Sequence, residues 1–199
     1  MFSMTKHYVL GLMAANRTGI LAAVSTALAE LGGNIRDIRL TVVENHFAMM
    51  LSADFPDRRD PQVIVSHLEG VGRPFGLSVL LRDPAGDSLP PLPSSESQIF
   101  QLTLAGPDQP GVLSRFSAAL AREQVDIIDL YGWRNEPGTP MLMLELAVPS
   151  FVEVDRLRGE LHKLAAQYEL TCQLEFITPG AQRDPRPLRQ RLPGGGFQG

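Results

Sequence analysis

Two short turns carry residue types suited to binding a small anion. They are Asn16-Arg17-Thr18-Gly19 and Asp108-Gln109-Pro110-Gly111, each between an alternating apolar run and a segment with helical spacing. Asn and Asp are frequent helix N-caps, Pro fits the first helical turn, and Gly lets another group approach the backbone. Free N–H groups and the positive end of the helix dipole would favour a carboxylate there. Such turns are also common without a ligand, so they do not establish a site by themselves.

The two turns belong to an internal repeat. Gly111 follows Gly19 by 92 residues, and residues of the same type recur at that spacing on both sides of the turns. The matching positions in the first copy are Leu10, Leu12, Leu21, Ser25, Ala27, Leu28, Ala29, Ile35 and Asp37. The repeat predicts two modules of about eighty residues, each large enough to bury a modest core.

Each copy predicts the same succession of elements. Alternating apolar residues indicate strands at 8–13, 38–42, 47–51 and 75–81 in the first copy and at 100–104, 128–134, 141–148 and 170–176 in the second. Helical spacing indicates helices at 20–31 and 63–71, and at 112–120 and 154–168. The order βαββαβ is the plan of a ferredoxin-like sandwich. We therefore expect an α+β protein of two tandem modules, each with a four-stranded antiparallel sheet and two helices on one face.

Composition sets the expected domain boundaries. The modules are predicted at 1–83 and 98–178, joined by a Pro/Ser-rich linker at 84–97 and followed by a flexible Arg/Gly/Pro tail at 179–199. We interpret the tail arginines as solvated, with contact to an acidic partner as the alternative; they are Arg183, Arg186, Arg189 and Arg191.

Charge and composition narrow the class of function. The net charge is −4 although the tail is basic, so the body of the chain is acidic and direct nucleic-acid binding is not expected. No apolar run approaches the eighteen or so residues of a membrane span, and no signal-peptide pattern is present. The single cysteine, Cys172, excludes an internal disulfide, so we expect a cytoplasmic protein.

Residues 108–113, Asp-Gln-Pro-Gly-Val-Leu, resemble the signature of an ACT domain when placed between a strand and a helix of a βαββαβ unit. The resemblance extends over about 6–83 and 98–178, and Gly-Gly-Asn-Ile at 32–35 is similar to the family's usual entry to its second strand. It implies small-molecule-binding regulatory modules that typically recognise amino acids. A tandem pair with no attached catalytic domain resembles the glycine cleavage system regulator group. The first copy has Arg17-Thr18 in place of a polar residue and proline, so the two copies need not bind the same ligand.

The resemblance also implies a binding site. In that family the ligand lies between two ACT units, against the strand-to-helix loop of one and the start of the second strand of the other. Carried onto this chain, these positions are Asn16, Arg17, Thr18, Gly19, Ile20, Leu21, Asn34 and Ile35, with Asp108, Gln109, Gly111, Val112, Leu113, Asp126 and Ile127 in the second copy. An oxygen of Asp108 or Asn16 would accept from an α-ammonium group while backbone N–H groups hold the α-carboxylate.

These observations predict a non-catalytic regulatory protein that senses an amino acid or similar metabolite at an ACT–ACT interface. Edge-strand pairing favours a homodimer, and the resemblance points to a transcription regulator of amino-acid metabolism as the partner. No cofactor is expected. The alternative is a ligand-independent interaction or co-repressor module that uses the sheet edges and the region of Trp133. A small enzyme is disfavoured, because no His/Asp/Glu or Cys/His set converges on either turn.

Several isolated residues have ordinary structural interpretations. The four histidines, His7, His46, His67 and His162, show no metal-ligand spacing. Cys172 alternates with strand residues and is expected to be a small buried hydrophobe. For the repeated charges Asp37 and Asp129, protection of a sheet edge and contact with a ligand or interface are both open. For Tyr131 and Trp133, expected on an edge strand, an interface and ordinary packing are equally open.

Overall fold

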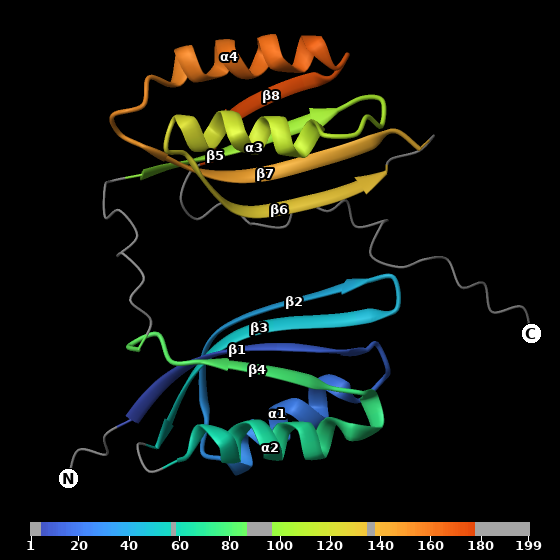
Figure 1. The fold of residues 1–199 in the computed structure, drawn as a ribbon, viewed down its shortest axis with the longest axis vertical. Helices are drawn as coiled ribbons and strands as arrows, with labels where there is room; N and C mark the ends of the chain where they lie inside the picture. The colour runs from blue at the N-terminus through green and yellow to red at the C-terminus, as the bar shows by residue number, and fades with distance from the viewer. Residues whose placement is uncertain (1–4, 57–58, 87–96, 135–137, 178–199) are drawn as a thin grey trace, which may run out of the picture. The chain divides into compact units, whose positions relative to one another are not determined.

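A computed structural model of the chain describes residues 5–56, 59–86, 97–134 and 138–177. The chain divides into two compact units, Met1–Pro90 and Pro91–Gly199, which contain the two repeats and are called module 1 and module 2 below. Each module is a four-stranded antiparallel sheet with two helices on one face, as the sequence predicts (Figure 1). The predicted linker and tail lie almost entirely outside the described residues.

Module 1 contains β1 (Thr5–Ala15), α1 (Ile20–Glu30), β2 (Asn34–Val43), β3 (His46–Pro56), α2 (Pro61–Gly72), a 3-10 turn η1 (Arg73–Phe75) and β4 (Ser78–Arg82). The strand order is β2-β3-β1-β4, so β1 is central, as its apolar residues on both faces indicate. The last strand begins later than predicted. Phe75 lies in η1 because Gly76 adopts φ +64°, a left-handed conformation that turns the chain before β4 begins.

Module 2 contains β5 (Ser97–Ala105), α3 (Val112–Arg122), β6 (Asp126–Arg134), β7 (Pro140–Pro149), α4 (Val154–Gln167) and β8 (Thr171–Phe176). Its strand order, β6-β7-β5-β8, reproduces that of module 1. Since β6 is an edge strand, Tyr131 and Trp133 lie at a sheet edge, as expected.

Each module has its own core between sheet and helices. In module 1 alternate residues of β1, such as Tyr8 and Leu10, are fully buried against Leu28 of α1 and Leu68 of α2. In module 2 the equivalent layer joins Leu102 and Leu104 to Phe116, Leu120 and Leu161. Each fully buried aliphatic or aromatic side chain contributes about 1.5–3 kcal/mol, so the two cores are the main source of stability.

The repeated aspartates have a local structural role. In β2 the pairing register shifts between Ile35 and Asp37, and Asp37 Oδ1 accepts a hydrogen bond of 2.8 Å from the N–H of Ile38. Asp129 does the same at the matching shift in β6, accepting from Leu130 at 2.9 Å. A bulge leaves backbone groups without a ladder partner, and each carboxylate supplies an acceptor there. The recurrence of aspartate therefore follows from a repeated bulge.

Strand β2 is exposed over its whole length, although one face was expected to be buried. Ile38, Leu40 and Val42 alternate on the side of the helices, yet each is 43% exposed. The reason is position, because α2 packs on β4 at the opposite edge of the sheet and β2 lies farthest from it (Figure 1).

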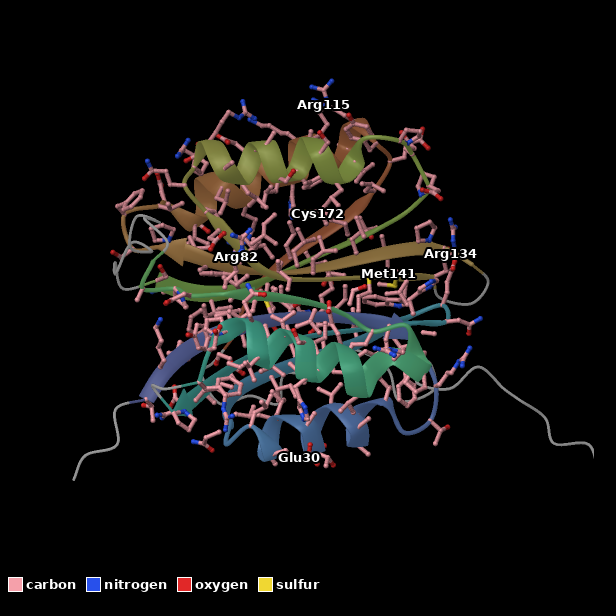
Figure 2. All side chains as sticks on the ribbon, turned by 60° about the horizontal axis from the view of Figure 1, so that its bottom comes forward. Glu30, Arg82, Arg115, Arg134, Met141 and Cys172 are labelled. Carbon is pink, nitrogen blue, oxygen red and sulfur yellow. The ribbon has the colours of Figure 1, made fainter. Side chains whose placement is uncertain are left out.

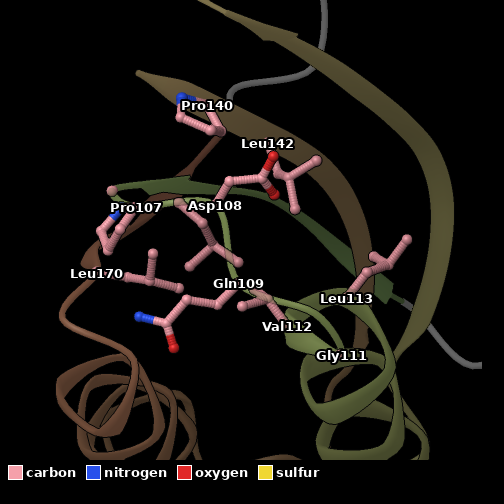
Figure 3. A pocket seen from close by; sticks show the side chains of 11 residues that line it. Pro107, Asp108, Gln109, Gly111, Val112, Leu113, Pro140, Leu142 and Leu170 are labelled. Atoms are coloured by element: carbon pink, nitrogen blue, oxygen red, sulfur yellow. The ribbon is translucent and has the colours of Figure 1, made fainter. Parts of the chain in front are cut away.

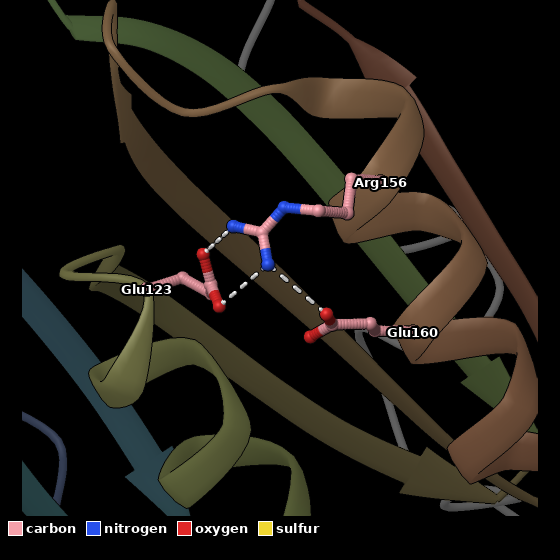
Figure 4. Close-up of polar contacts among 3 residues, drawn as sticks. All are labelled: Glu123, Arg156 and Glu160. Carbon is pink, nitrogen blue, oxygen red and sulfur yellow. Dashed lines mark hydrogen bonds and ion pairs between the residues drawn. The ribbon is translucent and has the colours of Figure 1, made fainter.

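A side-chain hydrogen bond or ion pair joins the two helices of each module. In module 2 Arg156 of α4 pairs with Glu123, just after α3, and with Glu160 at 3.1 Å (Figure 4). Its hydrogen bond to Glu123 is the main reason that the pKa of Arg156 is raised. In module 1 His67 Nε2 lies 2.9 Å from Glu30 Oε2, linking α2 to the end of α1. Within the described residues, no helix is both long and apolar enough to cross a membrane.

Candidate ligand-binding site

Both turns end in a left-handed glycine placed directly before a helix. Gly19 has φ +98° and Gly111 has φ +87°, and each is the N-cap residue. The expectation that Asn16 and Asp108 cap the helices is therefore wrong, as is the placement of Pro110 in the first helical turn. The left-handed glycine delays the start of the helix by three residues, and hydrophobic spacing alone does not show where the backbone enters that conformation.

No side chain caps the first turns of α1 and α3, although in α1 the N–H of Ile20 donates to the carbonyl oxygen of Arg17 at 3.2 Å. The first helical hydrogen bonds join Ala23 N–H to Gly19 O at 2.9 Å and Arg115 N–H to Gly111 O at 3.0 Å. Neither helix receives a side-chain cap hydrogen bond. Donors at a helix start have no intrahelical acceptor and lie at the positive end of the dipole. Binding of an anion at these turns stays a prediction.

In module 2 a pocket of about 220 Å³ opens beside this turn (Figure 3). Its apolar wall consists of Leu104, Val112, Pro140, Leu142 and Leu170, and its remaining lining is the turn itself, Gly106, Pro107, Asp108, Gln109, Gly111 and Leu113. The pocket lies where the end of β5, the start of α3, the start of β7 and the approach to β8 converge. The five turn residues predicted in the second copy are all brought together here.

The predicted second-strand residues lie elsewhere in each module. Asp126 and Ile127 pair with Ala147 and Leu146, at the end of the sheet remote from the pocket. In module 1 Asn34 and Ile35 pair with Asp54 and Ala53, opposite the start of β1 rather than its end. The resemblance assigns these residues to a ligand held by a different ACT unit, and that assignment stays a prediction.

A side-chain hydrogen bond, called the tether below, joins each turn to the segment that follows the second helix of its module. Gln109 donates from Nε2 to the carbonyl oxygen of Tyr168 at 3.0 Å, just after α4. Arg17, at the same repeat position, donates from Nη1 to the carbonyl oxygen of Pro74 at 3.2 Å. These long donors thus fix the turn to the segment that leads into the last strand. The sequence offers one signal of this role, a long polar side chain at the same place in both copies.

An ion pair stands at the pocket of module 2. Arg134, the last residue of β6, donates from Nη2 to Asp108 Oδ2 at 2.5 Å. The side chain of Arg134, labelled in Figure 2, is 60% exposed, and that of Asp108, labelled in Figure 3, is 68% exposed. Exposed pairs of this kind contribute little to stability. Because both side chains are mostly exposed, their charges are accessible to a ligand. Sequence analysis missed Arg134, because strand register alone brings it to the turn.

Among the described residues, no three His, Cys, Asp or Glu side chains are grouped so as to hold a metal ion. Cys172 lies half-buried against the core of module 2 (Figure 2). Burial raises the pKa of its thiol to about 11, so the thiol is protonated at neutral pH.

The sequence matches the ACT domain family twice, over residues 8–73 and 98–175. The chain therefore belongs to the ACT-domain family, a class of small-molecule-binding regulatory modules, and carries two ACT domains in tandem. A UPF0237 protein of Methanocaldococcus jannaschii is 35% identical over 75 residues, which are 37% of this chain and 83% of the relative. A UPF0237 protein of Streptococcus mutans is 32% identical over 77 residues, 39% of this chain and 88% of the relative.

Two solved structures share the tandem architecture. An unknown protein from Galdieria sulphuraria superposes with a TM-score of 0.71 at 22% identity, covering 88% of this chain and all of its own. A candidate glycine cleavage system transcriptional repressor superposes with a TM-score of 0.64 at 19% identity, covering 88% of this chain and 99% of its own. At these identities the likeness establishes the fold.

Proposed function

We propose that this protein is a non-catalytic regulator that senses an amino acid or similar small metabolite and reports it to a partner protein. The observation that carries the proposal is the pocket of module 2, which joins an apolar wall to the uncapped start of α3. A pocket with a few converging polar groups is the common form of a small-molecule site. The ligand binds at the turn, and a second ACT unit completes the site.

The charges at the pocket suit the two ends of a free amino acid. The α-carboxylate meets the N–H groups at the start of α3 and the guanidinium of Arg134, while Asp108 accepts from the α-ammonium group. When the ligand binds, the Asp108–Arg134 ion pair separates, and each of the two side chains contacts one charged group of the ligand instead. The side chain of the ligand enters the space beside Leu104, Leu142 and Leu170.

Regulation follows if ligand binding favours one arrangement of the ACT units over another. Homodimer formation through a sheet edge is supported by β2, whose exposed apolar residues would be covered by a second chain. The likeness to a glycine cleavage system repressor supports a transcription regulator of amino-acid metabolism as partner, with this acidic chain making no direct contact with nucleic acid. We place this activity in the cytoplasm.

The composition of the pocket supports binding without catalysis. Among the described residues that line it, Asp108 is the only ionisable side chain, and they include no nucleophile with a neighbouring base. The exposed edge β2 favours one competing function, a constitutive interaction module that needs no ligand.

A thermal-shift screen of the twenty amino acids plus folate-pathway and nucleotide metabolites separates these functions. Ligand at about a hundred times its Kd adds roughly 2.7 kcal/mol to the stability of the folded state. For a protein of this size the melting temperature should rise by roughly 5–10 °C. A selective rise supports the sensor. A flat screen with a well-folded protein contradicts it and favours the interaction module.

The variant Gly111→Leu places a bulky side chain at the pocket and should abolish the shift. A Cβ at Gly111 meets no atom within 4 Å, so the cost to the fold is the left-handed backbone, roughly 1–2 kcal/mol. Gly159→Leu on the exposed side of α4, where a Cβ also meets no atom within 4 Å, is the control and should keep the shift. Unchanged affinity in Gly111→Leu would contradict a site at this turn.

A further inference from the structure

The pocket of module 2 has a counterpart position in module 1 that the strand pairing identifies. Ala14 pairs with Phe47 across β1 and β3. In module 2 Ala105 pairs with Met141, so the next pair is Gly106 with Pro140, and the N–H of Gly106 donates to the carbonyl oxygen of Pro140 at 3.3 Å. Phe47 in module 1 therefore stands where Pro140 lines the pocket in module 2.

Phe47 occupies that position as a core residue. It is 2% exposed, and Ala14 and Met49, the counterparts of Gly106 and Leu142, are each 4% exposed. All three belong to the core of module 1. In module 2 the counterparts Gly106, Pro140 and Leu142 are only partly buried and face the pocket. Phe47 is larger than Pro140 and Ala14 is larger than Gly106, so module 1 has bulkier buried side chains where module 2 has an open pocket.

The charged pair at the rim is also confined to module 2. Asp108 corresponds to Asn16, and Arg134, which pairs with Pro140, corresponds to Val42, which pairs with Phe47. Module 1 thus carries an amide and an aliphatic side chain where module 2 carries a carboxylate and a guanidinium. Module 1 therefore lacks both charged side chains of the pair, and only Asn16 and the backbone N–H groups of its turn remain to meet an α-ammonium and an α-carboxylate.

The size and the apolar wall of the pocket limit the class of amino acid that can bind there. A dry apolar cavity of about 150 Å³ holds benzene, so 220 Å³ is enough for the side chain of a medium-sized amino acid. The wall of Leu104, Val112, Pro140, Leu142 and Leu170 has no polar side-chain atom to pair with a buried hydroxyl, amide or charge, and leaving such a group unpaired is costly. An unbranched or branched aliphatic side chain carries no such cost.

From these differences we infer that module 2 is the ligand-binding copy and module 1 the filled copy, with one aliphatic α-amino acid bound per chain. The inference deepens the proposed function and rests on it. Module 1 keeps the glycine turn and its tether as scaffold, while Pro140, Leu142, Asp108 and Arg134 give module 2 its binding capacity. Specificity within the aliphatic class comes from the depth of the space between Leu142 and Leu170.

The test is calorimetric titration of the full chain with L-valine, L-leucine, L-isoleucine and L-methionine, against glycine, L-serine, L-aspartate and L-lysine. We expect a stoichiometry of one per chain for at least one aliphatic amino acid and at least tenfold weaker binding of the other four. Two sites per chain, or preference for a polar or charged amino acid, overturns this inference while leaving a sensor in place. If none of these eight amino acids binds and no compound of the thermal-shift screen raises the melting temperature, the proposed function itself is overturned.

Matched variants transfer residues between the copies. Pro140→Phe installs the filling residue of module 1 and should abolish binding, whereas Phe47→Leu in module 1 should leave affinity and stoichiometry unchanged. Arg134→Val installs the module 1 residue at an exposed position and should weaken binding at least tenfold without affecting folding.

Backbone amide chemical shifts of the unmodified protein, titrated with the tightest aliphatic ligand, should change at 104–113 and 140–142. Changes centred on 12–21 and 47–49 would assign the ligand to module 1 and refute the inference.

Discussion

The two modules share one backbone plan but hold an Asp–Arg ion pair at opposite ends of the sheet. In module 1 a polar cluster lies at the start of β1, in which Asp54 accepts hydrogen bonds from His7 at 2.9 Å and from Arg36. The hydrogen bond from His7 has the largest effect and that from Arg36 the next largest, and together they hold the pKa of Asp54 below its usual range. The turn of module 1, at the other end, is closed by Phe47.

Module 2 shows the reverse arrangement. The positions of His7, Asp54 and Arg36 are taken by Ile99, Ala147 and Ile128, as the pairing of Ile99 with Ala147 and the matching bulge show. Its charged pair stands instead at the turn, beside the pocket. What the copies share, the left-handed glycine, the tether and the bulge aspartate, positions the turn. What differs decides whether a ligand fits there, so resemblance between copies is evidence of fold more than of shared binding.

The largest expected difference between the copies is the cost of removing Phe47. Phe47→Ala deletes a ring that is 2% exposed and should destabilise module 1 by about 3–5 kcal/mol, because the surrounding core relaxes only partly around the cavity. Pro140→Ala, at the same place in module 2, should cost less than about 1.5 kcal/mol, since a partly buried residue beside an open pocket leaves no new cavity. Urea unfolding of both variants measures the difference. Equal losses would contradict the assignment of Phe47 as the filling residue.

The contrast also shows what the sequence could reveal. Alternation at Leu10 and Leu12 and helical spacing after each glycine predict the elements, because burial on one face imposes a period on the chain. The repeat then predicts two similar modules, and the resemblance to the ACT signature assigns a ligand to the turn, whose five residues line the pocket. The N-cap positions of Asn16 and Asp108 were wrong, since backbone φ at the following glycine leaves no mark in hydrophobic spacing.

Other features of the site depend on cross-strand register. Arg134 reaches Asp108, 26 residues away, only because β6 pairs with β7 so that its end lies beside the turn. Phe47 closes module 1 because it faces Ala14, and a single-residue slip would turn its ring to the other face of the sheet. Register is set by the packing of the whole sheet, so a local pattern of residue types does not contain it.

A second, smaller difference lies at the ends of the first helices. Gly32 after α1 has φ +77°, and Gln124, its counterpart after α3, has φ +57°. An L-residue in this conformation costs roughly 1–2 kcal/mol relative to the right-handed region, and glycine does not bear that cost. Gln124→Gly should therefore stabilise module 2 by about 0.5–1 kcal/mol, after allowance for the greater freedom of glycine in the unfolded chain.

The reciprocal change should have the opposite sign. Gly32→Ala should destabilise module 1 by about 1 kcal/mol, because it introduces the strained conformation and sets a Cβ 3.3 Å from Cγ of Pro56. Thermal unfolding of the two single variants and of the double variant tests the pair. Changes of the same sign in both single variants would show that the two helix ends are held by different interactions.

The smallest expected difference concerns Cys172, which pairs with Leu104 as Val79 pairs with Leu12 in module 1. Burial raises the pKa of the thiol to about 11, above the value of about 8.5 in an unfolded chain. The folded state therefore holds the proton more tightly, so the contribution of the thiol to stability is complete below pH 8.5 and is lost as the pH rises towards 11. Cys172→Val, which installs the module 1 residue, should remove this part of the pH dependence.

Urea unfolding at pH 7 and at pH 10 measures this effect, and the free energy of unfolding should fall more between these pH values in the unmodified protein than in Cys172→Val. At pH 8 the thiol of the folded protein should also react with iodoacetamide more slowly than the thiol of the urea-unfolded protein. The contrary outcome is an equal loss of stability in both proteins and an equal reaction rate in the folded and unfolded states. It would mean that the thiol is as accessible in the fold as in the unfolded chain, and that β8 does not pack against the core as β4 does in module 1.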